Sequence, residues 1–298
     1  AMRQIKRTGT DKETIYTCYV IDAQRKLIGV VPLRTLICAK DEELVQDLME
    51  EDVVSVHTMD DQEEVAHIFK KYNWMALPVT DLENRLVGII TVDDIVDVIE
   101  QETTEDMEKM AALLPSDEEY LKTPVIKLAK NRIVWLCVLM ISGTLSSMVI
   151  GHYQALLATA MALSNFITII TGTGGNAGSQ ASTMIIRGMA LGEIQVKDTL
   201  RVVWKELRVG LLCGAALAAV NMVRMTFFSP DTGVLMDFTV SVSMAAVVVL
   251  SKTIGCTLPI FAKIVRVDPA MMAGPLISTV VDAVALIIYF NIASTLLL

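Results

Sequence analysis

The hydrophobic positions divide the chain into a front part of short periodic segments and a rear part of long apolar runs. Each of five runs in the rear part is long enough to cross the roughly 30 Å of hydrocarbon in a bilayer. Basic residues gather before the first run, between the second and third, and between the fourth and fifth. Because basic loops stay on the cytoplasmic side, the pattern predicts a cytoplasmic amino terminus and an external carboxyl terminus. The five runs are residues 133–150, 155–186, 202–228, 239–264 and 270–298.

The front part contains one pattern twice. Residues 19–31 hold YVID followed by LIGVV, and residues 78–90 hold PVTD followed by LVGII. Each copy is typical of a strand, a polar turn, a second strand that passes through a glycine, and a helix that begins near Leu33 or Val92. One structural unit therefore occurs twice in the front part.

Only the second copy has a complete upstream half. A strand over residues 53–57 and an amphipathic helix over residues 62–72 precede it. The first copy needs an equivalent start before residue 1, so we expect the sequence to begin inside a domain. The pattern predicts a partial domain over residues 1–40 and a complete one over residues 41–99.

The composition agrees with this division. The chain is 53% hydrophobic with a mean hydropathy of +0.52, which is too apolar for an ordinary soluble protein of this size. Residues 1–127 hold 14 basic and 27 acidic side chains, whereas residues 128–298 hold 11 and 7. The sequence therefore predicts an α-helical membrane protein with five transmembrane helices, preceded by a cytoplasmic α/β region.

An acidic segment over residues 100–127 is predicted to form a helix that connects the two parts. From Asp93 to Glu119 there are eleven acidic residues, including Asp117, and one base, Lys109. A solvated acidic helix is one interpretation. The other is that divalent cations bridge these carboxylates to acids of the front part and relieve their repulsion, which suits Mg²⁺ with its preference for oxygen ligands. The second interpretation predicts a sensor of cytoplasmic cation.

One carboxylate lies within the last apolar run. A charge near the centre of a bilayer costs about 2.5 to 3.5 kcal/mol, so Asp282 is expected to face a partner or a water-filled path. Gly274 and Pro275, about two turns upstream, are able to loosen the helix and turn carbonyl groups toward the same path. Asp282 is therefore a candidate cation site; the alternative is a structural acid bonded to a neighbouring hydroxyl.

The second run contains the small and polar sequence TGTGGNAGSQ at residues 171–180. It lacks the GK[ST] ending of a phosphate-binding loop. Small residues let membrane helices approach closely, while Asn176, Ser179 and Gln180 offer polar oxygens inside the membrane. Close packing alone is one interpretation, and a polar ion path shared with Asp282 is the other.

Residues 88–94, GIITVDD, resemble the end of a CBS domain, a family that commonly binds an adenine nucleotide between paired motifs. The resemblance makes Thr91 and Asp94 the candidate nucleotide-binding residues. In the first copy Pro32 and Thr35 replace the corresponding threonine and aspartate, which counts against nucleotide binding here.

The GTGGNAGSQ element in the second of five runs, the DPA sequence at residues 268–270 and Asp282 together resemble the MgtE magnesium channel/transporter family. The resemblance covers essentially the whole chain. It implies a homodimeric, Mg²⁺-selective channel of the inner or plasma membrane, with a pore between subunits and a helix that closes the pore when cytoplasmic Mg²⁺ is high. It also implies an amino-terminal helical domain that this sequence lacks.

The resemblance assigns residues to two roles. Asp282 matches the family's pore carboxylate, and acids of the front part match its regulatory metal sites. The regulatory residues are Asp61, Glu63, Asp94, Asp97, Glu102, Glu105 and Asp106. Together with the polar residues described above, the expected pore lining is Gly174, Gly175, Asn176, Ser179, Gln180, Gly274, Pro275, Ser278 and Thr279.

Two positions depart from expectation. Gly274 stands where some relatives carry a polar asparagine before the proline. Lys252 falls near the middle of the fourth run, where a cation is unexpected in a cation path. Three arrangements are open to it: its ammonium extends to the interface, it pairs with Asp282 or Glu206, or it points away from the pore.

Two copies of Asp282 across a dimer axis would supply about the charge that one hydrated Mg²⁺ requires, and the absence of an ATPase motif predicts downhill transport. A coupled carrier and a membrane-anchored sensor of cation or nucleotide without transport are the alternatives. The sequence shows no catalytic arrangement, since its three histidines lie far apart and no HExxH occurs, and no disulfide or zinc spacing among its five cysteines. No nucleic-acid partner is expected.

Overall fold

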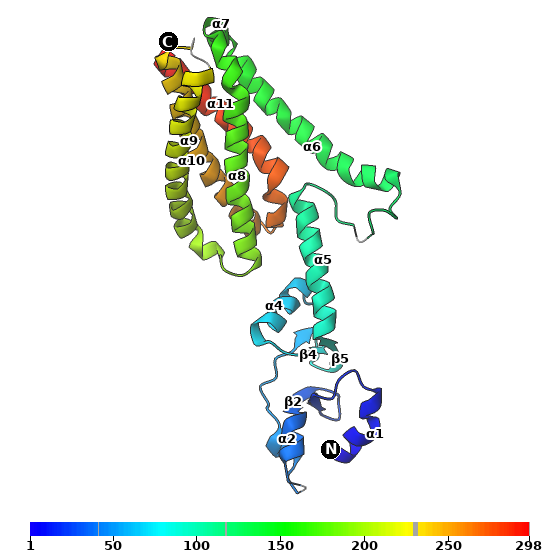
Figure 1. Ribbon diagram of the computed structural model, residues 1–298. Coiled ribbons are helices and arrows are strands. Elements are labelled where there is room, and N and C mark those ends of the chain that lie inside the picture. Colours follow the sequence, from blue (N-terminus) through cyan, green and yellow to red (C-terminus); the bar gives the residue numbers. More distant parts are fainter. Residues whose placement is uncertain (41, 117, 229–231, 298) are drawn as a thin grey trace. The chain divides into compact units, whose positions relative to one another are not determined.

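The computed structural model describes residues 1–40, 42–116, 118–228 and 232–297. Asp117 of the acidic segment and the carboxyl-terminal Leu298 therefore lie outside the described residues. The chain forms two compact units, Ala1–Thr104 and Glu105–Leu298 (Figure 1). The first is a mixed α/β unit and the second is helical.

The repeat in the front part is confirmed as two antiparallel hairpins. Strands β1 (Thr17–Ile21) and β2 (Leu27–Pro32) form the first hairpin, and β4 (Ala76–Thr80) and β5 (Leu86–Thr91) form the second. In each hairpin the strand register shifts directly after the residue that pairs with the repeat's glycine. These residues are Val20, which pairs with Gly29, and Val79, which pairs with Gly88. Helices begin at the predicted positions: α2 is Leu33–Cys38 and α5 is Val92–Met110.

The second copy has the upstream half that the sequence predicts. Helix α4 (Gln62–Tyr72) matches its predicted range, and the left-handed Asn73 ends it. Strand β3 is shorter than predicted, Val56–His57, and pairs in parallel with β4. Before β1 and β3 lie three short helices. They are α1 (Met2–Thr8), the 3₁₀ helix η1 (Gly9–Asp11) and α3 (Val45–Leu48).

The core of the second copy lies between α4, α5 and the sheet. Val65 and Phe69 of α4 pack with Leu77 of β4 and Ile95 of α5. Val65 and Phe69 lie one helical turn apart, a spacing that predicts a buried helix face from the sequence. The carboxylate of Asp61 caps α4 by accepting a hydrogen bond from the backbone N–H of Glu63 at 2.9 Å.

The predicted connecting helix over residues 100–127 is wrong in extent. Helix α5 already begins at Val92, as part of the second copy, and ends at Met110. The described residues between Met110 and the start of α6 at Val125 contain no helix. Ala112 adopts a left-handed conformation, and Pro115 follows soon after, so the helix cannot continue.

Within the described part of the second unit, four helical stretches are long and apolar enough to cross a membrane, and they correspond to the first, third, fourth and fifth predicted runs. They are Val125–His152, Val196–Phe228, Val234–Ile264 and Pro269–Leu297. The helices of the unit are α6 (Val125–His152), α7 (Gln154–Thr159), η2 (Met161–Phe166), α8 (Ile167–Ala190), η3 (Val196–Asp198), α9 (Thr199–Phe228), α10 (Val234–Ile264), η5 (Pro269–Met272) and α11 (Gly274–Leu297).

The second predicted run, residues 155–186, differs from the structure. Helices α7 and η2 occupy its first part, and the long helix α8 extends from Ile167 to Ala190. With 24 residues, α8 is about 36 Å long and so long enough to cross a bilayer. The glycines and polar residues of α8 lower its mean hydropathy. A membrane helix can contain such residues where they face other helices, and α8 packs against α10 and α11 with eleven buried residues.

Helix α10 is the centre of the bundle, with α8, α9 and α11 packed around it (Figure 1). Glycines allow the closest approach. A Cβ added to Gly255 of α10 would lie 3.0 Å from the Cα of Gly178 on α8 and would overlap its carbonyl oxygen. Helix α6 contacts α11 but has no buried residue, so nearly its whole apolar surface remains exposed.

Candidate ion site around Asp282

Asp282 lies on α11 against the backbone of α8. A Cβ added to Gly175 of α8 would lie 3.6 Å from Asp282 Oδ1 and 3.5 Å from Ser278 Oγ, at ordinary van der Waals distance, so the carboxylate lies directly beside the α8 backbone. The half-buried carboxylate makes no hydrogen bond or ion pair with any described residue. The described contacts therefore do not support a structural acid bonded to a hydroxyl, whereas an unpaired carboxylate inside a membrane unit can accept a cation.

Serine hydroxyls line the same seam between α8 and α11. Ser278 Oγ donates to the carbonyl of Gly274 at 3.1 Å and lies 3.4 Å from Ser179 Oγ. Thr279 Oγ1 donates to the carbonyl of Pro275 at 2.9 Å. The seam thus combines one carboxylate with oxygen atoms that can hold the water shell of a hydrated ion.

The residues expected to line one pore occupy two different surroundings. Gly175, Ser179 and Ser278 lie at the Asp282 seam. Asn176 and Gln180 instead line an open groove together with Glu206 and Lys252, and Ser179 reaches both places. Gly174 is packed tightly, since a Cβ on it would lie 2.8 Å from Val247 and 3.1 Å from Ser251 Oγ.

Lys252 does not pair with Asp282. It lines the groove between α8, α9 and α10, and neither it nor Glu206 forms an ion pair with a described residue. Of the three arrangements open from the sequence, the structure has Lys252 directed to the groove, away from the carboxylate on α11. From the sequence, Glu206 is considered only as a partner for Lys252. However, Glu206 is the only acidic residue of the third run, and this could have indicated a second polar site.

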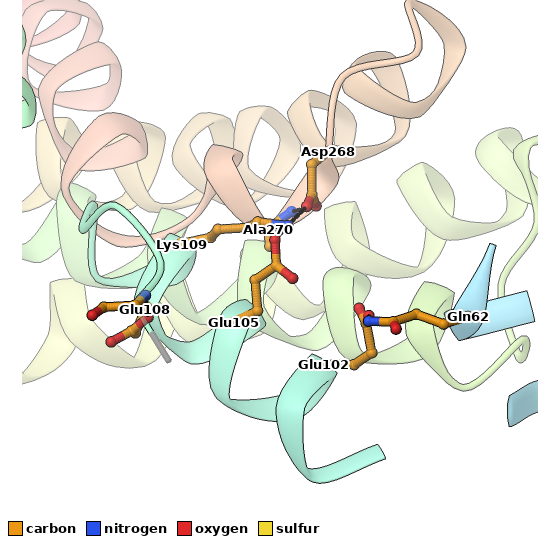
Figure 2. A network of polar contacts seen from close by, with 8 residues as sticks. Gln62, Glu102, Glu105, Glu108, Lys109, Asp268 and Ala270 are labelled. Atoms are coloured by element: carbon orange, nitrogen blue, oxygen red, sulfur yellow. Dashed lines mark hydrogen bonds and ion pairs between the residues drawn. The ribbon is translucent and has the colours of Figure 1, made fainter. Parts of the chain in front are cut away.

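The end of helix α5 is held against the α10–α11 loop by Lys109, which the sequence marks only as the lone base of the acidic segment (Figure 2). Its Nζ lies 2.6 Å from Asp268 Oδ2 and 2.5 Å from Glu105 Oε1. The other carboxylate oxygen of Asp268 accepts the N–H of Ala270 at 2.8 Å. Burial disfavours the charge of Lys109, but its bonds to Asp268 and Glu105 outweigh this effect and hold the pKa of its ammonium above the ordinary value.

Met110, the next residue, adds an apolar contact to the Lys109 ion pairs. Together these contacts form what we call the seat of α5. Met110 packs against Ile186, Ala270 and Ala273. Its carbonyl oxygen would lie 2.6 Å from a Cβ on Gly274, whose φ is +46°. A glycine at position 274 is therefore required by this close approach and by its left-handed backbone.

The expected regulatory acids are distributed along α4 and α5. Asp61 caps α4, Glu63 lies 3.8 Å from His67, and Glu105 binds Lys109. Gln62 Nε2 donates to Glu102 Oε1 at 2.6 Å, which holds the start of α4 beside α5 (Figure 2). Asp97 and Asp106 lie on the same helix α5. Among the described residues no three acidic, histidine or cysteine side chains converge as a metal cluster.

The two candidate nucleotide-binding residues bind each other. The N–H and hydroxyl of Thr91 donate to Asp94 Oδ2 at 3.0 and 2.7 Å, which caps α5. A cavity in the first unit is lined by Tyr19, Glu50 and Asp52 among others, but by neither Thr91 nor Asp94. The Tyr19 hydroxyl is buried there with no hydrogen-bond partner in the described chain, and burial raises its pKa to about 12.

The fold and the site define a multi-span membrane protein with a CBS-type unit and an unpaired carboxylate among its helices. Residues 45–101 match the CBS domain, and residues 167–292 match the family model MgtE, described as divalent cation transporter. The membrane part of the chain is thus similar to the MgtE family over residues 167–292.

Similar proteins carry the same family name. The magnesium transporter MgtE of Thermus thermophilus is 38% identical over 296 residues, covering 99% of this chain and 65% of the relative. That of Enterococcus faecalis is 35% identical over 294 residues, covering 99% and 64%. The crystal structure of the cytosolic domain of the Mg²⁺ channel MgtE in complex with ATP is 48% identical over 33% of this chain and 39% of its own, with a TM-score of 0.32. The chain spans about 65% of the length of the first of these relatives.

Proposed function

We propose that this protein moves Mg²⁺ across the membrane along a path that passes Asp282. The observation that carries the proposal is the carboxylate of Asp282, which is half-buried on α11, lies beside Gly175 and has no partner among the described residues. The similarity to proteins named magnesium transporters supports Mg²⁺ as the cargo. Those relatives are transporters rather than enzymes, and the site offers charge and oxygen atoms but no nucleophile and base in contact.

The proposed path binds a hydrated ion. Mg²⁺ loses its water reluctantly and keeps octahedral coordination, so Asp282, Ser278 and Ser179 would hold it through water molecules. One carboxylate balances only half of the ion's charge. We therefore propose a homodimer in which two copies of Asp282 face one ion across a two-fold axis. Transport is downhill, driven by the concentration gradient and the membrane potential.

We further propose that cytoplasmic Mg²⁺ regulates the path through acids of α4 and α5. The bond between Gln62 and Glu102 holds Asp61 and Glu63 near α5, where an ion can bridge carboxylates of both helices. The seat of α5 formed by Lys109 and Asp268 supports a role of the helix end in closing the path. In this proposal residues 1–40 are part of a first CBS domain, residues 41–99 are the second, and residues 128–298 form the pore.

The arrangement of basic loops supports a place in the inner or plasma membrane, with the amino terminus in the cytoplasm and the carboxyl terminus outside. The CBS unit would then be exposed to cytoplasmic Mg²⁺. A sensor without transport remains the competing function, and equilibrium Mg²⁺ binding with no flux in liposomes would favour it.

The first prediction is that Asp282→Asn abolishes Mg²⁺ uptake in cells that lack their own Mg²⁺ transport. The amide keeps the size of the side chain but removes the charge that attracts the ion. Asp237→Asn is the matched control, because Asp237 lies in the first turn of α10 and bonds to Thr232. Both variants are compared at equal membrane expression. Uptake by Asp282→Asn equal to that of the control would remove the proposed path.

A further inference from the structure

A polar groove lies on the second unit between α8, α9 and α10, on a different face of α8 from Asp282. Asn176, Gln180 and Thr183 of α8, Glu206 of α9 and Lys252 of α10 line it. Its volume is about 740 Å³, many times the roughly 30 Å³ that one water occupies. The groove is open along one side, so it can admit a ligand from the surroundings of the helices.

Lys252 indicates that the groove binds a ligand, because its charge is buried without a described partner. It is only 6% exposed, yet it forms no hydrogen bond or ion pair with any described residue. A lysine in a membrane helix is costly unless its ammonium meets an anionic or polar partner. Since Lys252 lines the groove, that partner can reach it there.

Glu206 places the opposite charge in the same groove. It is half-buried and forms no ion pair with Lys252 or with any other described residue. Two opposite charges are thus held apart on facing helices, with the amides of Asn176 and Gln180 beside them. A ligand with an anionic group and a cationic group satisfies both charges.

The Glu206 end of the groove lies at a depth that suits a lipid headgroup, and the groove extends from there to Lys252 near the middle of the fourth run. Glu206 is seven residues into α9, about 10 Å from its first residue on the side expected to be cytoplasmic. Trp204, two residues earlier, is 59% exposed, as is typical of tryptophan at the membrane–water interface. Leu212, one turn beyond Val209 of the groove, is 74% exposed and can contact an acyl chain.

We propose that this groove binds the headgroup of an aminophospholipid. The ammonium of Lys252 and the amide N–H groups of Gln180 and Asn176 donate to the lipid phosphate. The carboxylate of Glu206 accepts hydrogen bonds from the primary ammonium of the headgroup, which a choline headgroup cannot donate. The proposal does not depend on transport, because none of these side chains forms a described hydrogen bond or ion pair with Asp282.

The choice of a lipid over a soluble anion follows from the charges. Inorganic phosphate satisfies Lys252 but leaves Glu206 beside an anion. A phosphatidylglycerol headgroup has the same defect. Phosphatidylethanolamine carries both charges at a fixed spacing and also brings acyl chains to the exposed apolar side chains of α8 and α9.

The test measures lipid binding to the full chain, purified in detergent and stripped of lipid, by native mass spectrometry and thermal unfolding. Phosphatidylethanolamine, phosphatidylcholine and phosphatidylglycerol with identical acyl chains are compared, with inorganic phosphate and phosphoethanolamine as competitors. Lys252→Met keeps the stem and removes the charge, and Glu206→Gln keeps the shape. Lys263→Met and Glu193→Gln, both exposed positions outside the groove, are the matched controls.

We expect phosphatidylethanolamine to bind about tenfold more tightly than phosphatidylcholine, the factor that one charged hydrogen bond provides. Lys252→Met should weaken every phospholipid, and Glu206→Gln should remove only the preference for the primary amine. Phosphoethanolamine should compete, and the controls should behave as the wild type. Equal affinity of all three lipids in the wild type, or unchanged binding in Lys252→Met, would overturn the proposal. Inorganic phosphate that stabilises the protein as much as the lipid would overturn its assignment to a headgroup.

Discussion

Position 274 shows how a single atom decides which residue the chain can use. The backbone of Gly274 is left-handed, a conformation that asparagine also tolerates. The deciding contact is the carbonyl oxygen of Met110, 2.6 Å from where a Cβ would stand. The glycine thus allows the end of α5 to lie close against the start of α11.

We predict that Gly274→Ala loosens that seat. Overpacking against a backbone atom costs about 1–3 kcal/mol, so the end of α5 should separate from the α10–α11 loop. Faster amide hydrogen exchange at residues 108–113 would report the separation. Gly143→Ala in α6 is the control, because nothing lies within 4 Å of its Cβ. Equal exchange rates in both variants would show that the Met110 carbonyl can move aside without destabilising the end of α5.

A second residue-scale prediction concerns the cap of α5. The N–H and hydroxyl of Thr91 hold the pKa of the Asp94 carboxyl below its ordinary value. The lowered pKa adds stability that is present at neutral pH and is lost as the pH falls through the pKa of the folded state. Asp94→Asn should therefore destabilise the first unit at pH 7, and the difference from the wild type should shrink on acidification.

The fluorescence of Trp74, the only tryptophan of the first unit, measures this unfolding when Trp135 and Trp204 are replaced by phenylalanine. Asp93→Asn, one position earlier and exposed, is the control. A difference between Asp94→Asn and the wild type that stays constant from pH 7 to pH 3 would contradict the assigned cause.

At the scale of elements, Lys109 occupies the place that a bound cation would take between Glu105 and Asp268. We predict that Lys109→Met leaves two carboxylates facing each other and releases the end of α5. The loss should be on the order of 1 kcal/mol, since Glu105 and Asp268 are 38% and 32% exposed and solvent weakens the pair. Millimolar Mg²⁺ should restore the contact in the variant by bridging the carboxylates, and should have little effect on it in the wild type.

Limited proteolysis of the described segment after Met110 measures this release. Lys122→Met is the control, because Lys122 binds only Glu119 and its side chain is 75% exposed. Protection by Mg²⁺ that is the same in the wild type and in Lys109→Met would show that the lysine does not substitute for an ion there.

The elements differ in how far the sequence predicts them. Local hydrophobic spacing and turn residues determine the two hairpins, α4 and the starts of α2 and α5. The sequence pattern alone is therefore sufficient to predict these elements. The end of α5 and the seat of Lys109 join residues 159 positions apart, and no local spacing encodes such a contact. The second predicted run begins too early for α8. The first part of that run is apolar because α7 and η2 pack into the hydrophobic core that contains Leu163 and Phe166.

The candidate site was predictable in part for the same reason. A carboxylate in an apolar run is visible in the sequence, so Asp282 could be selected. The division of the polar residues of α8 between the ion seam and the groove depends on which helix each face meets. That information appears only when α8, α9 and α11 are packed around α10 and α11 also packs against α8.

At the scale of the whole molecule, a shared ion between two copies of Asp282 has a measurable consequence. In cells that express wild type and Asp282→Asn in equal amounts, we predict uptake of about one quarter of the wild-type rate, because only one dimer in four carries both carboxylates. Independent paths in each subunit would give about one half. A mixture of wild type with Asp237→Asn at the same ratio is the control and should keep full uptake.

The contact between Gly178 and Gly255 limits how such a path can open. Two backbones that touch without intervening side chains have no slack through which one can slide past the other, so α8 and α10 must travel as a single rigid body. We therefore predict that opening moves α11, which follows the short η5 and the left-handed Gly274, and α6, which has no buried residue among those described. Spectroscopic labels placed on α8 and α10 should keep a constant separation during transport, while pairs that include α11 report the motion.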